Sequence, residues 1–267
     1  MIVSILLVTF NAEKYIEKTL RSCLEQTYLN FEILVLDNAS SDRTLKIVKN
    51  IKDSRITCFE GKNNIGPYAG LNFLLNKTSG KYIAIQDHDD IWYPEKLTKQ
   101  VDFLNKNSKY IACGTNTYYY YESKNVLVLN SNSPQTNFVD HTSLFFRNRN
   151  FRYDCNFLLA DEHFEKKVLA EAGKIGCLQT PLTIHRIKGD ATNLSTYRFK
   201  INFKNINEYF YINGFNVLSL RNLLYLIFIK IIPDNIIWKV KHRLISKNGK
   251  SISVSEFVFK NPKIDFI

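Results

Sequence analysis

Continuous apolar runs alternate with amphipathic segments over the first 108 residues. The runs have the length and β-branched content of buried strands and cover residues 2–8, 31–36, 56–59 and 82–86. Helical spacing between them, with prolines at two helix starts, predicts helices over residues 12–25, 43–51, 67–77 and 94–107. This alternation predicts an α/β fold in which helices cover both faces of a Rossmann-like, mostly parallel sheet.

The pattern is less regular over residues 109–197. We expect a strand over residues 110–117, extended by the tyrosines up to Tyr121, then a strand and a turn-rich loop over residues 126–137. A helix is expected over residues 161–172, followed by one or two short strands over residues 175–185. Residues 1–197 are therefore expected to form one domain.

Composition changes in the remaining residues, 198–267. The chain has a net charge of +11, and this segment alone has 12 Lys and Arg against 4 Asp and Glu. Apolar residues around Trp238 alternate with bases over residues 230–243, which is typical of an interfacial amphipathic helix on an anionic membrane. The alternative is a helix packed on the domain with its basic face in solvent. No nucleic-acid motif is present, so no nucleic-acid partner is expected.

Cysteine usage indicates the compartment. The five cysteines are scattered and contain no Cys-x-x-Cys pair, which argues against a disulfide scaffold and a zinc site and favours the cytoplasm. The apolar first residues lack a basic region and a cleavage site, so they are interpreted as a strand rather than a signal peptide. With the basic tail, this predicts a cytoplasmic protein held peripherally on the inner face of the cell membrane.

Three carboxylates follow the apolar run that ends at Gln86. Asp87, Asp89 and Asp90 are expected at the carboxyl end of a parallel strand, where α/β sheets bind ligands. Unpaired acids at this density suit Mg²⁺ or Mn²⁺. The structural alternative is that Asp89 or Asp90 caps the following helix.

Other polar residues are expected at the same edge of the sheet. Thr9 and Asp37 end the first two strands, and Asp37 can accept hydrogen bonds from a base or a ribose. Asn64 and Gly66 precede a helix whose N-terminus favours anions. Neither a phosphate-binding Gly-Lys-Ser/Thr loop nor a Gly-x-Gly-x-x-Gly dinucleotide motif is present, so NAD and P-loop chemistry are not supported.

Four stretches together resemble family 2 glycosyltransferases with the GT-A fold, of the bacterial surface-polysaccharide type. They are residues 3–11, 36–44, 64–72 and 86–97, the last of which resembles Asp-x-Asp-Asp-x-Trp-x-Pro-x-Lys-Leu. The resemblance is strong over residues 2–105, weaker over residues 150–195 and absent from the tail.

The resemblance implies a role for each matching residue. Thr9, Asn11 and Asp37 would contact the nucleoside of a nucleotide-diphosphate sugar, and Asn64 and Gly66 are assigned to the donor site as well. For the acids, the resemblance implies that Asp87 binds the ribose and that Asp89 and Asp87 ligate Mn²⁺ or Mg²⁺. Asp90 would orient the site or touch the sugar.

The resemblance also places the base in the second half. Family members have an acid pair there, which matches Asp161 and Glu162; Glu162 is the first choice and Asp161 the alternative. Without the family, both would be acids that complement a helix dipole. The family's Tyr-Arg-x-His-Gly segment matches residues 185–189 with His185 for Tyr and Lys188 for His. Lys188 could neutralise a diphosphate. Either the metal has one protein ligand fewer, or His185 takes the place of the family's His.

The expected protein is an inverting, metal-dependent glycosyltransferase acting on a polysaccharide or lipid-linked glycan. Residues 1–108 would form its nucleotide-sugar-binding half, residues 109–197 its acceptor half, and residues 198–267 a basic helical extension. The alternatives are a nucleotidyltransferase acting on a sugar phosphate and a non-catalytic sugar- or nucleotide-binding module.

Overall fold

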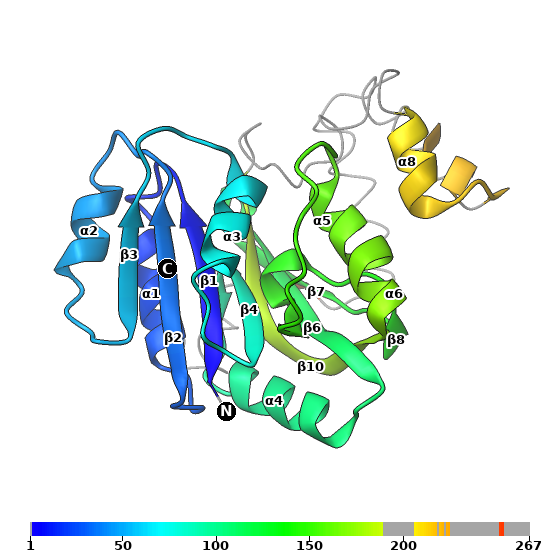
Figure 1. Cartoon of the computed structure of the whole chain (residues 1–267), viewed down its shortest axis with the longest axis horizontal. Helices are drawn as coiled ribbons and strands as arrows, with labels where there is room; N and C mark the ends of the chain where they lie inside the picture. The colour runs from blue at the N-terminus through cyan, green and yellow to red at the C-terminus, as the bar shows by residue number, and fades with distance from the viewer. Residues whose placement is uncertain (1, 189–205, 218, 222, 225–250, 254–267) are drawn as a thin grey trace.

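The computed structural model describes residues 2–188, 206–217, 219–221, 223–224 and 251–253. Strands and helices alternate through its first half, as the hydrophobic pattern predicts (Figure 1). The elements there are β1 (Val3–Thr9), α1 (Ile16–Leu24), β2 (Phe31–Asp37), α2 (Thr44–Asn50), β3 (Ile56–Glu60), α3 (Pro67–Leu75), β4 (Tyr82–Asp87), β5 (Ile91–Trp92) and α4 (Lys96–Lys106).

The second half contributes longer and more bent elements. They are β6 (Tyr110–Tyr121), η1 (Glu122–Lys124), β7 (Val126–Asn130), β8 (Gln135–Thr136), η2 (His141–Ser143), β9 (Phe145–Arg147), α5 (Ala160–His163), the π-helical η3 (Phe164–Leu169), α6 (Ala170–Ala172), β10 (Lys174–Ile187), α8 (Ile206–Asn213) and β11 (Ser251–Ser253). The tyrosines extend β6 as expected. The short strands expected over residues 175–185 are instead one strand of 14 residues, β10.

All strands of the described residues belong to one mixed sheet. Its main path runs in the order β11-β7-β6-β9-β4-β1-β2-β3, and β10 pairs with β5, β6 and β8. Strands β1 to β4 are parallel, whereas β9 runs antiparallel between β4 and β6. The α/β class is therefore confirmed. Pairing is parallel among β1 to β4 and between β6 and β10, and it is antiparallel elsewhere in the sheet.

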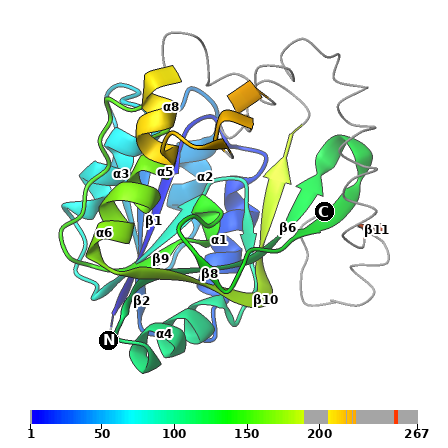
Figure 2. The ribbon, with the colours of Figure 1, turned by 90° about the vertical axis from the view of Figure 1, so that its right-hand side faces the viewer.

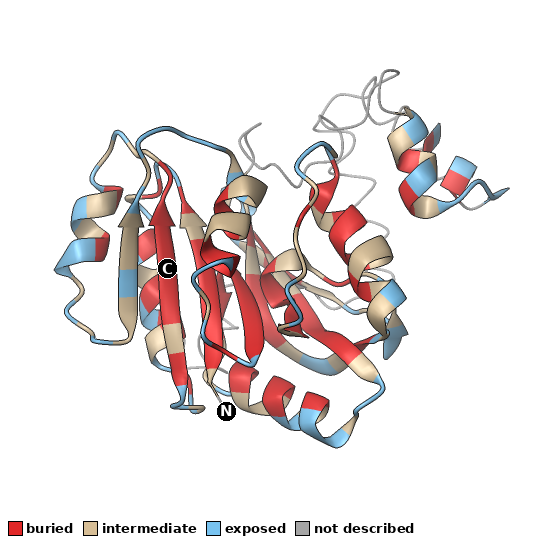
Figure 3. Ribbon diagram, viewed as in Figure 1, coloured by how far each residue is buried: buried red, intermediate tan, exposed pale blue. Residues whose placement is uncertain are grey.

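Helices cover both faces of the sheet because alternate strand residues point to opposite sides. Ile5 and Leu7 of β1 pack with the buried residues of α1 and α4, whereas Leu6 packs with those of α3 and with Phe164 of η3. The buried residues accordingly follow the central strands and the inner faces of the helices (Figure 3). This two-sided core fixes the strand ends that form the site.

No helix among the described residues is long and apolar enough to cross a membrane. The amphipathic pattern around Trp238 lies outside the described residues. Of the tail, the structure describes α8 with the short helical segment after it, and β11.

Candidate active site

The carboxyl ends of β1, β2 and β4 meet at one edge of the sheet. Thr9 is paired in register with Asp37, and Val8 with Asp87, so the predicted residues lie on adjacent strands. Asp37 and Thr9 are buried, and within the described part of the chain the Thr9 hydroxyl and one Asp37 carboxylate oxygen have no hydrogen-bond partner. Buried polar atoms without partners are rare, and these two oxygens are available to bond a ligand.

The neighbouring loops are held by amide side chains. Asn11, with a positive φ of 48°, accepts a hydrogen bond from the Ser41 amide at 2.9 Å. Asn64 accepts hydrogen bonds from the Asn38 side chain and the Gly66 amide, both at 2.9 Å. The structure therefore places Asn11 and Asn64 where they shape the loops around the edge at which Thr9 and Asp37 lie.

The turn after β4 separates the three predicted carboxylates. Asp87 is the most accessible, with a side chain 40% exposed. Asp89 forms an ion pair with Lys188, with 2.6 Å between its Oδ2 and the Lys188 Nζ. Asp90 is fully buried and accepts two hydrogen bonds, from the Arg186 amide at 2.8 Å and from His185 Nδ1 at 2.7 Å.

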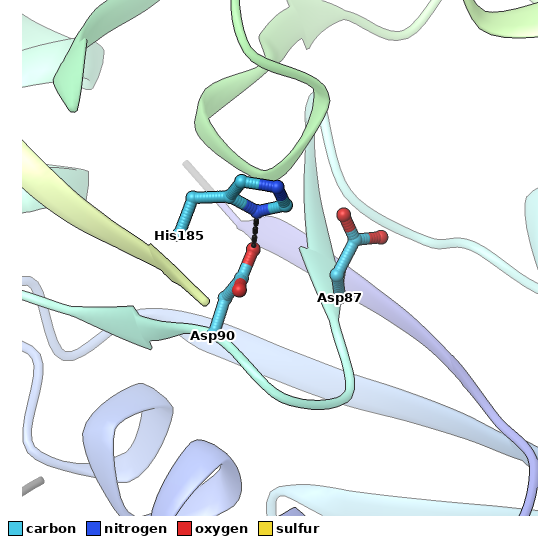
Figure 4. A group of neighbouring side chains, drawn as sticks. All are labelled: Asp87, Asp90 and His185. Atoms are coloured by element: carbon cyan, nitrogen blue, oxygen red, sulfur yellow. Dashed lines mark hydrogen bonds and ion pairs between the residues drawn. The ribbon is translucent and has the colours of Figure 1, made fainter. Parts of the chain in front are cut away.

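One group of ligating side chains lies at this turn. One potential ligand atom from each of Asp87, Asp90 and His185 lies within 4.8 Å of the others, and the His185 ring points over Asp90 beside Asp87 (Figure 4). Carboxylates are suitable ligands for Mg²⁺ or Mn²⁺, and an imidazole can add a nitrogen ligand to a transition metal, so the residues fit a divalent cation. Asp87 offers the accessible oxygens, whereas Asp90 already holds His185. The predicted ligand Asp89 lies outside this group.

The acids and imidazoles of the group shift each other's pKa. Burial raises the pKa of Asp90 to about 6. Burial lowers the pKa of His185, but the Asp90 carboxylate beside it prevails and raises it to about 10. For Asp87, burial acts upward, but the neighbouring His141 prevails and lowers the pKa of the carboxyl. The Asp90 carboxylate therefore favours a proton on His185, and a cation that takes this imidazole as a ligand would displace that proton.

A cationic layer at the end of β10 closes the turn. Arg186 donates from Nε to the Asp89 carbonyl at 3.1 Å and pairs with Glu122 at 3.0 Å. Its guanidinium lies 4.7 Å from the ring centroid of Tyr15, as does the Lys188 ammonium. Sequence reasoning assigned no role to Arg186, Glu122 or Tyr15; the signal available for Arg186 was its match to the Arg of the family's segment.

A chain of polar aromatic groups leads away from Asp87. His141 Nδ1 lies 3.8 Å from the Asp87 carboxylate, and its Nε2 lies 2.9 Å from the Tyr153 hydroxyl. Burial together with the charges of Asp161 and Asp87 raises the pKa of Tyr68 and of Tyr153. The Tyr68 ring lies 6.3 Å from the His141 ring and 5.6 Å from the Tyr153 ring, so Tyr68 belongs to the same cluster as His141, the neighbour of Asp87. No sequence pattern distinguished His141 or Tyr153.

The two acids that begin α5 point to different surroundings. Glu162 has a side chain only 3% exposed and pairs with Lys166 at 2.8 Å. Lys166 also donates to Asn213 of α8 at 2.6 Å, and burial raises the pKa of Glu162. Asp161 is half-buried and is a hydrogen-bond partner of the Tyr68 hydroxyl. The structure thus groups Asp161, rather than Glu162, with Asp87.

This fold is that of GT-A glycosyltransferases. The structure is similar to Staphylococcus aureus TarS 1–349 in complex with UDP-GlcNAc, with a TM-score of 0.61 and 19% identity over 73% of this chain and 61% of that one. It is also similar to the mannosyltransferase PcManGT from Pyrobaculum calidifontis in complex with GDP-Man and Mn²⁺, with a TM-score of 0.56 and 19% identity over 74% of this chain and 60% of that one. At this identity the similarity establishes the fold.

The sequence model of glycosyl transferase family 2 matches residues 4–166, and the chain belongs to this family. The Escherichia coli protein WfaP, named as a UDP-Glc:alpha-D-GlcNAc-diphosphoundecaprenol beta-1,3-glucosyltransferase, is 34% identical over 139 residues, 51% of this chain and 54% of WfaP. WfgD of Escherichia coli, named for the same reaction, is 40% identical over 107 residues, 40% of this chain and 42% of WfgD. The chain thus spans about half the length of these relatives.

Proposed function

We propose that this protein transfers a sugar from a nucleoside diphosphate sugar to a hydroxyl of a polysaccharide or lipid-linked glycan. The observation that carries the proposal is the meeting of Thr9, Asp37 and Asp87 at one edge of the sheet, with two buried polar atoms lacking partners among the described residues. Residues 1–108 form the donor half in this account, and residues 109–197 the acceptor half.

The donor would lie across the strand ends. Thr9 and Asp37 offer their buried oxygens to the nucleoside, and Asn11, Asn64 and Gly66 shape the surrounding loops. Lys188 and Arg186 supply positive charge on the side of Asp89, where the diphosphate would lie. A cationic side chain in a partly buried site binds phosphate more strongly than one in open solvent.

Asp87 and His185, with Asp89 once Lys188 has moved to the diphosphate, would hold a divalent cation, Mn²⁺ or Mg²⁺. When bound, such a cation stabilises the negative charge of a leaving diphosphate. Asp90 acts through His185, because its two hydrogen bonds fix the imidazole and the start of the Arg186 backbone. The support is that Asp87 and His185 lie within ligand distance of one another, in the group that Asp90 completes.

Asp161 is the base that the geometry favours. Its carboxylate is a partner of Tyr68, whose ring lies 6.3 Å from that of His141, the neighbour of Asp87. Glu162, in contrast, is paired with Lys166. Asp161 would take the proton of the acceptor hydroxyl as that oxygen attacks the anomeric carbon, and the bond from that carbon to the diphosphate oxygen would break. A single displacement of this kind inverts the anomeric configuration.

The acceptor is proposed to be lipid-linked, on the inner face of the cell membrane. The support is that WfaP and WfgD are named for transfer to a GlcNAc-diphosphoundecaprenol and that residues 198–267 are strongly basic. Both names also specify UDP-Glc, so a UDP-sugar is the first donor to examine.

A transfer assay tests the proposal. Purified protein is incubated with UDP-glucose and a GlcNAc-diphospholipid, with and without Mn²⁺, and product is followed by mass spectrometry. A product of added hexose mass that is lost with Asp87→Asn supports the proposal. A folded protein that transfers no sugar from UDP-, dTDP-, GDP- or CMP-sugars contradicts it, and release of pyrophosphate from a nucleoside triphosphate with a sugar phosphate would identify a nucleotidyltransferase instead.

A further inference from the structure

An exposed apolar surface lies on α8 and the residues that follow it. Nine large apolar side chains are exposed among the described residues, and five of them fall within residues 211–224. The most exposed are Val217 at 86% and Phe215 at 82%. We call this set the α8 surface: Tyr211, Phe215, Val217, Leu220 and Leu224. A cluster of this kind marks an interaction site more often than scattered single residues do.

The exposed charge of the segment that carries the α8 surface is positive. Residues 206–224 contain one acid, Glu208, and its carboxylate faces inward to accept a hydrogen bond from the Leu159 amide at 2.7 Å. The exposed Arg221 lies within the segment, and the Lys167 ammonium lies 5.2 Å from the ring centroid of Tyr211. Within residues 206–224, exposed apolar side chains with Arg221 and no exposed acid match a bilayer containing anionic lipids.

The underside of α8 is joined to the helix that begins with Asp161. Glu208 accepts the hydrogen bond from the amide of Leu159, the residue directly before α5. Asn213 accepts a hydrogen bond from the Lys166 ammonium, which also pairs with Glu162. Figures 1 and 2 show α8 near α5 at one end of the molecule. A partner that fixes α8 therefore also fixes the start of the helix that carries the proposed base.

We propose that the α8 surface docks on an anionic membrane and thereby holds the start of α5 toward lipid-linked acceptors. The membrane contact stands on the apolar and basic side chains alone. The consequence for the acceptor rests on the proposed function. A protein partner is the rival occupant, and it predicts no dependence on lipid.

Vesicle co-sedimentation of the full chain tests the proposal. The vesicles are phosphatidylcholine alone or mixed with phosphatidylglycerol, and the variants are Phe215→Ser/Val217→Ser and Val217→Glu. The second variant guards against a folding effect because Phe215 packs on Phe210, whereas Val217 is almost fully exposed. The matched control is Leu29→Ser, a 74% exposed apolar residue before β2, at the opposite edge of the sheet from the strand ends of the site.

Wild type and Leu29→Ser should bind the mixed vesicles, and both α8 variants should bind about tenfold more weakly. Binding by the α8 variants equal to wild type, or an equal loss with Leu29→Ser, would overturn the proposal. Calorimetry with UDP-glucose on the same samples tests the proposed function separately from the membrane contact. Vesicle binding that depends on the α8 surface in a protein that binds no nucleotide sugar would refute the proposed function and leave the membrane contact standing.

Discussion

The ammonium of Lys188 lies 2.6 Å from the carboxylate of Asp89, which joins the residue after β10 to the turn after β4. In the resemblance to family 2, Asp89 is the expected metal ligand and Lys188 takes the place of a His. A lysine here brings a fixed positive charge to the region where the donor diphosphate is proposed to lie. We therefore propose that Lys188 exchanges its partner, the Asp89 carboxylate, for the diphosphate when the donor binds.

Replacing Lys188 tests this exchange of partners. We expect Lys188→Met to weaken binding of UDP-glucose by about tenfold or more, because a charged contact to phosphate is lost. Lys188→Arg keeps the charge and should retain most of the affinity. Calorimetric titration measures both variants, and a Lys188→Met protein that binds as tightly as wild type would show that Lys188 has only a structural partner in Asp89.

The two acids of α5 predict opposite outcomes. Asp161→Asn should lower kcat by about 100-fold or more, the usual contribution of a general base, while donor affinity stays unchanged. Glu162→Gln should retain most of the activity, because its carboxylate is paired with Lys166 and only 3% exposed. Initial rates of sugar transfer check both variants. The reverse order of effects would return the base to Glu162, the first choice from the sequence.

Removing the Asp90 carboxylate should lower the free energy of unfolding, because two buried groups hydrogen-bond to it. Asp90→Ala leaves the buried Arg186 amide without its acceptor and leaves His185 without its carboxylate, so we expect a loss of about 3 kcal/mol in the free energy of unfolding. Asp90→Asn keeps an acceptor for the amide and should lose less. Chemical denaturation compares the two, and equal losses would contradict this role.

Lys96 predicts a pH dependence of stability. It is fully buried, donates to Gln100 at 2.9 Å and lies 3.7 Å from the Trp92 ring centroid, and burial lowers its pKa from 10.5 to about 7. Between these two pH values the unfolded chain binds more protons than the folded one, so the free energy of unfolding rises with pH. Below this window the contribution of Lys96 to the free energy of unfolding does not change with pH.

Lys96→Met should remove this dependence. From about pH 7 to about pH 9, the free energy of unfolding of wild type should rise relative to that of the variant by ~1–2 kcal/mol. Urea denaturation at several pH values measures the difference. Parallel pH profiles for the two proteins would show that Lys96 keeps an ordinary pKa in the fold.

The first half of the fold could be predicted because parallel strands buried on both faces are continuous apolar runs. The second half could not be predicted to the same degree. In β10 the polar stretch of Gln179 and Thr180 with Pro181 interrupts the apolar pattern, and the register with β6 shifts between Leu178 and Thr183. This irregular strand was therefore expected as short pieces, although it is continuous and pairs with β5, β6 and β8.

The same distinction applies to the site. Residues at strand ends could be placed together, because the ends of parallel strands share one edge of the sheet. The contacts of Lys188 with Asp89 and of Arg186 with Glu122 depend on the path of β10, which no local pattern determines. For the same reason, the sequence did not connect His141 with Asp87 and Tyr153, since that contact depends on how the loop before β9 packs.

Calorimetric titration of a nucleoside diphosphate sugar is the most direct test of the central claim. UDP-glucose, followed by dTDP-, GDP- and CMP-sugars, would be titrated into wild type and Asp87→Asn, with and without Mn²⁺. We predict that one nucleotide class binds wild type, that Mn²⁺ tightens the binding and that Asp87→Asn loses the effect of the metal. A folded wild-type protein that binds none of these donors would contradict the account.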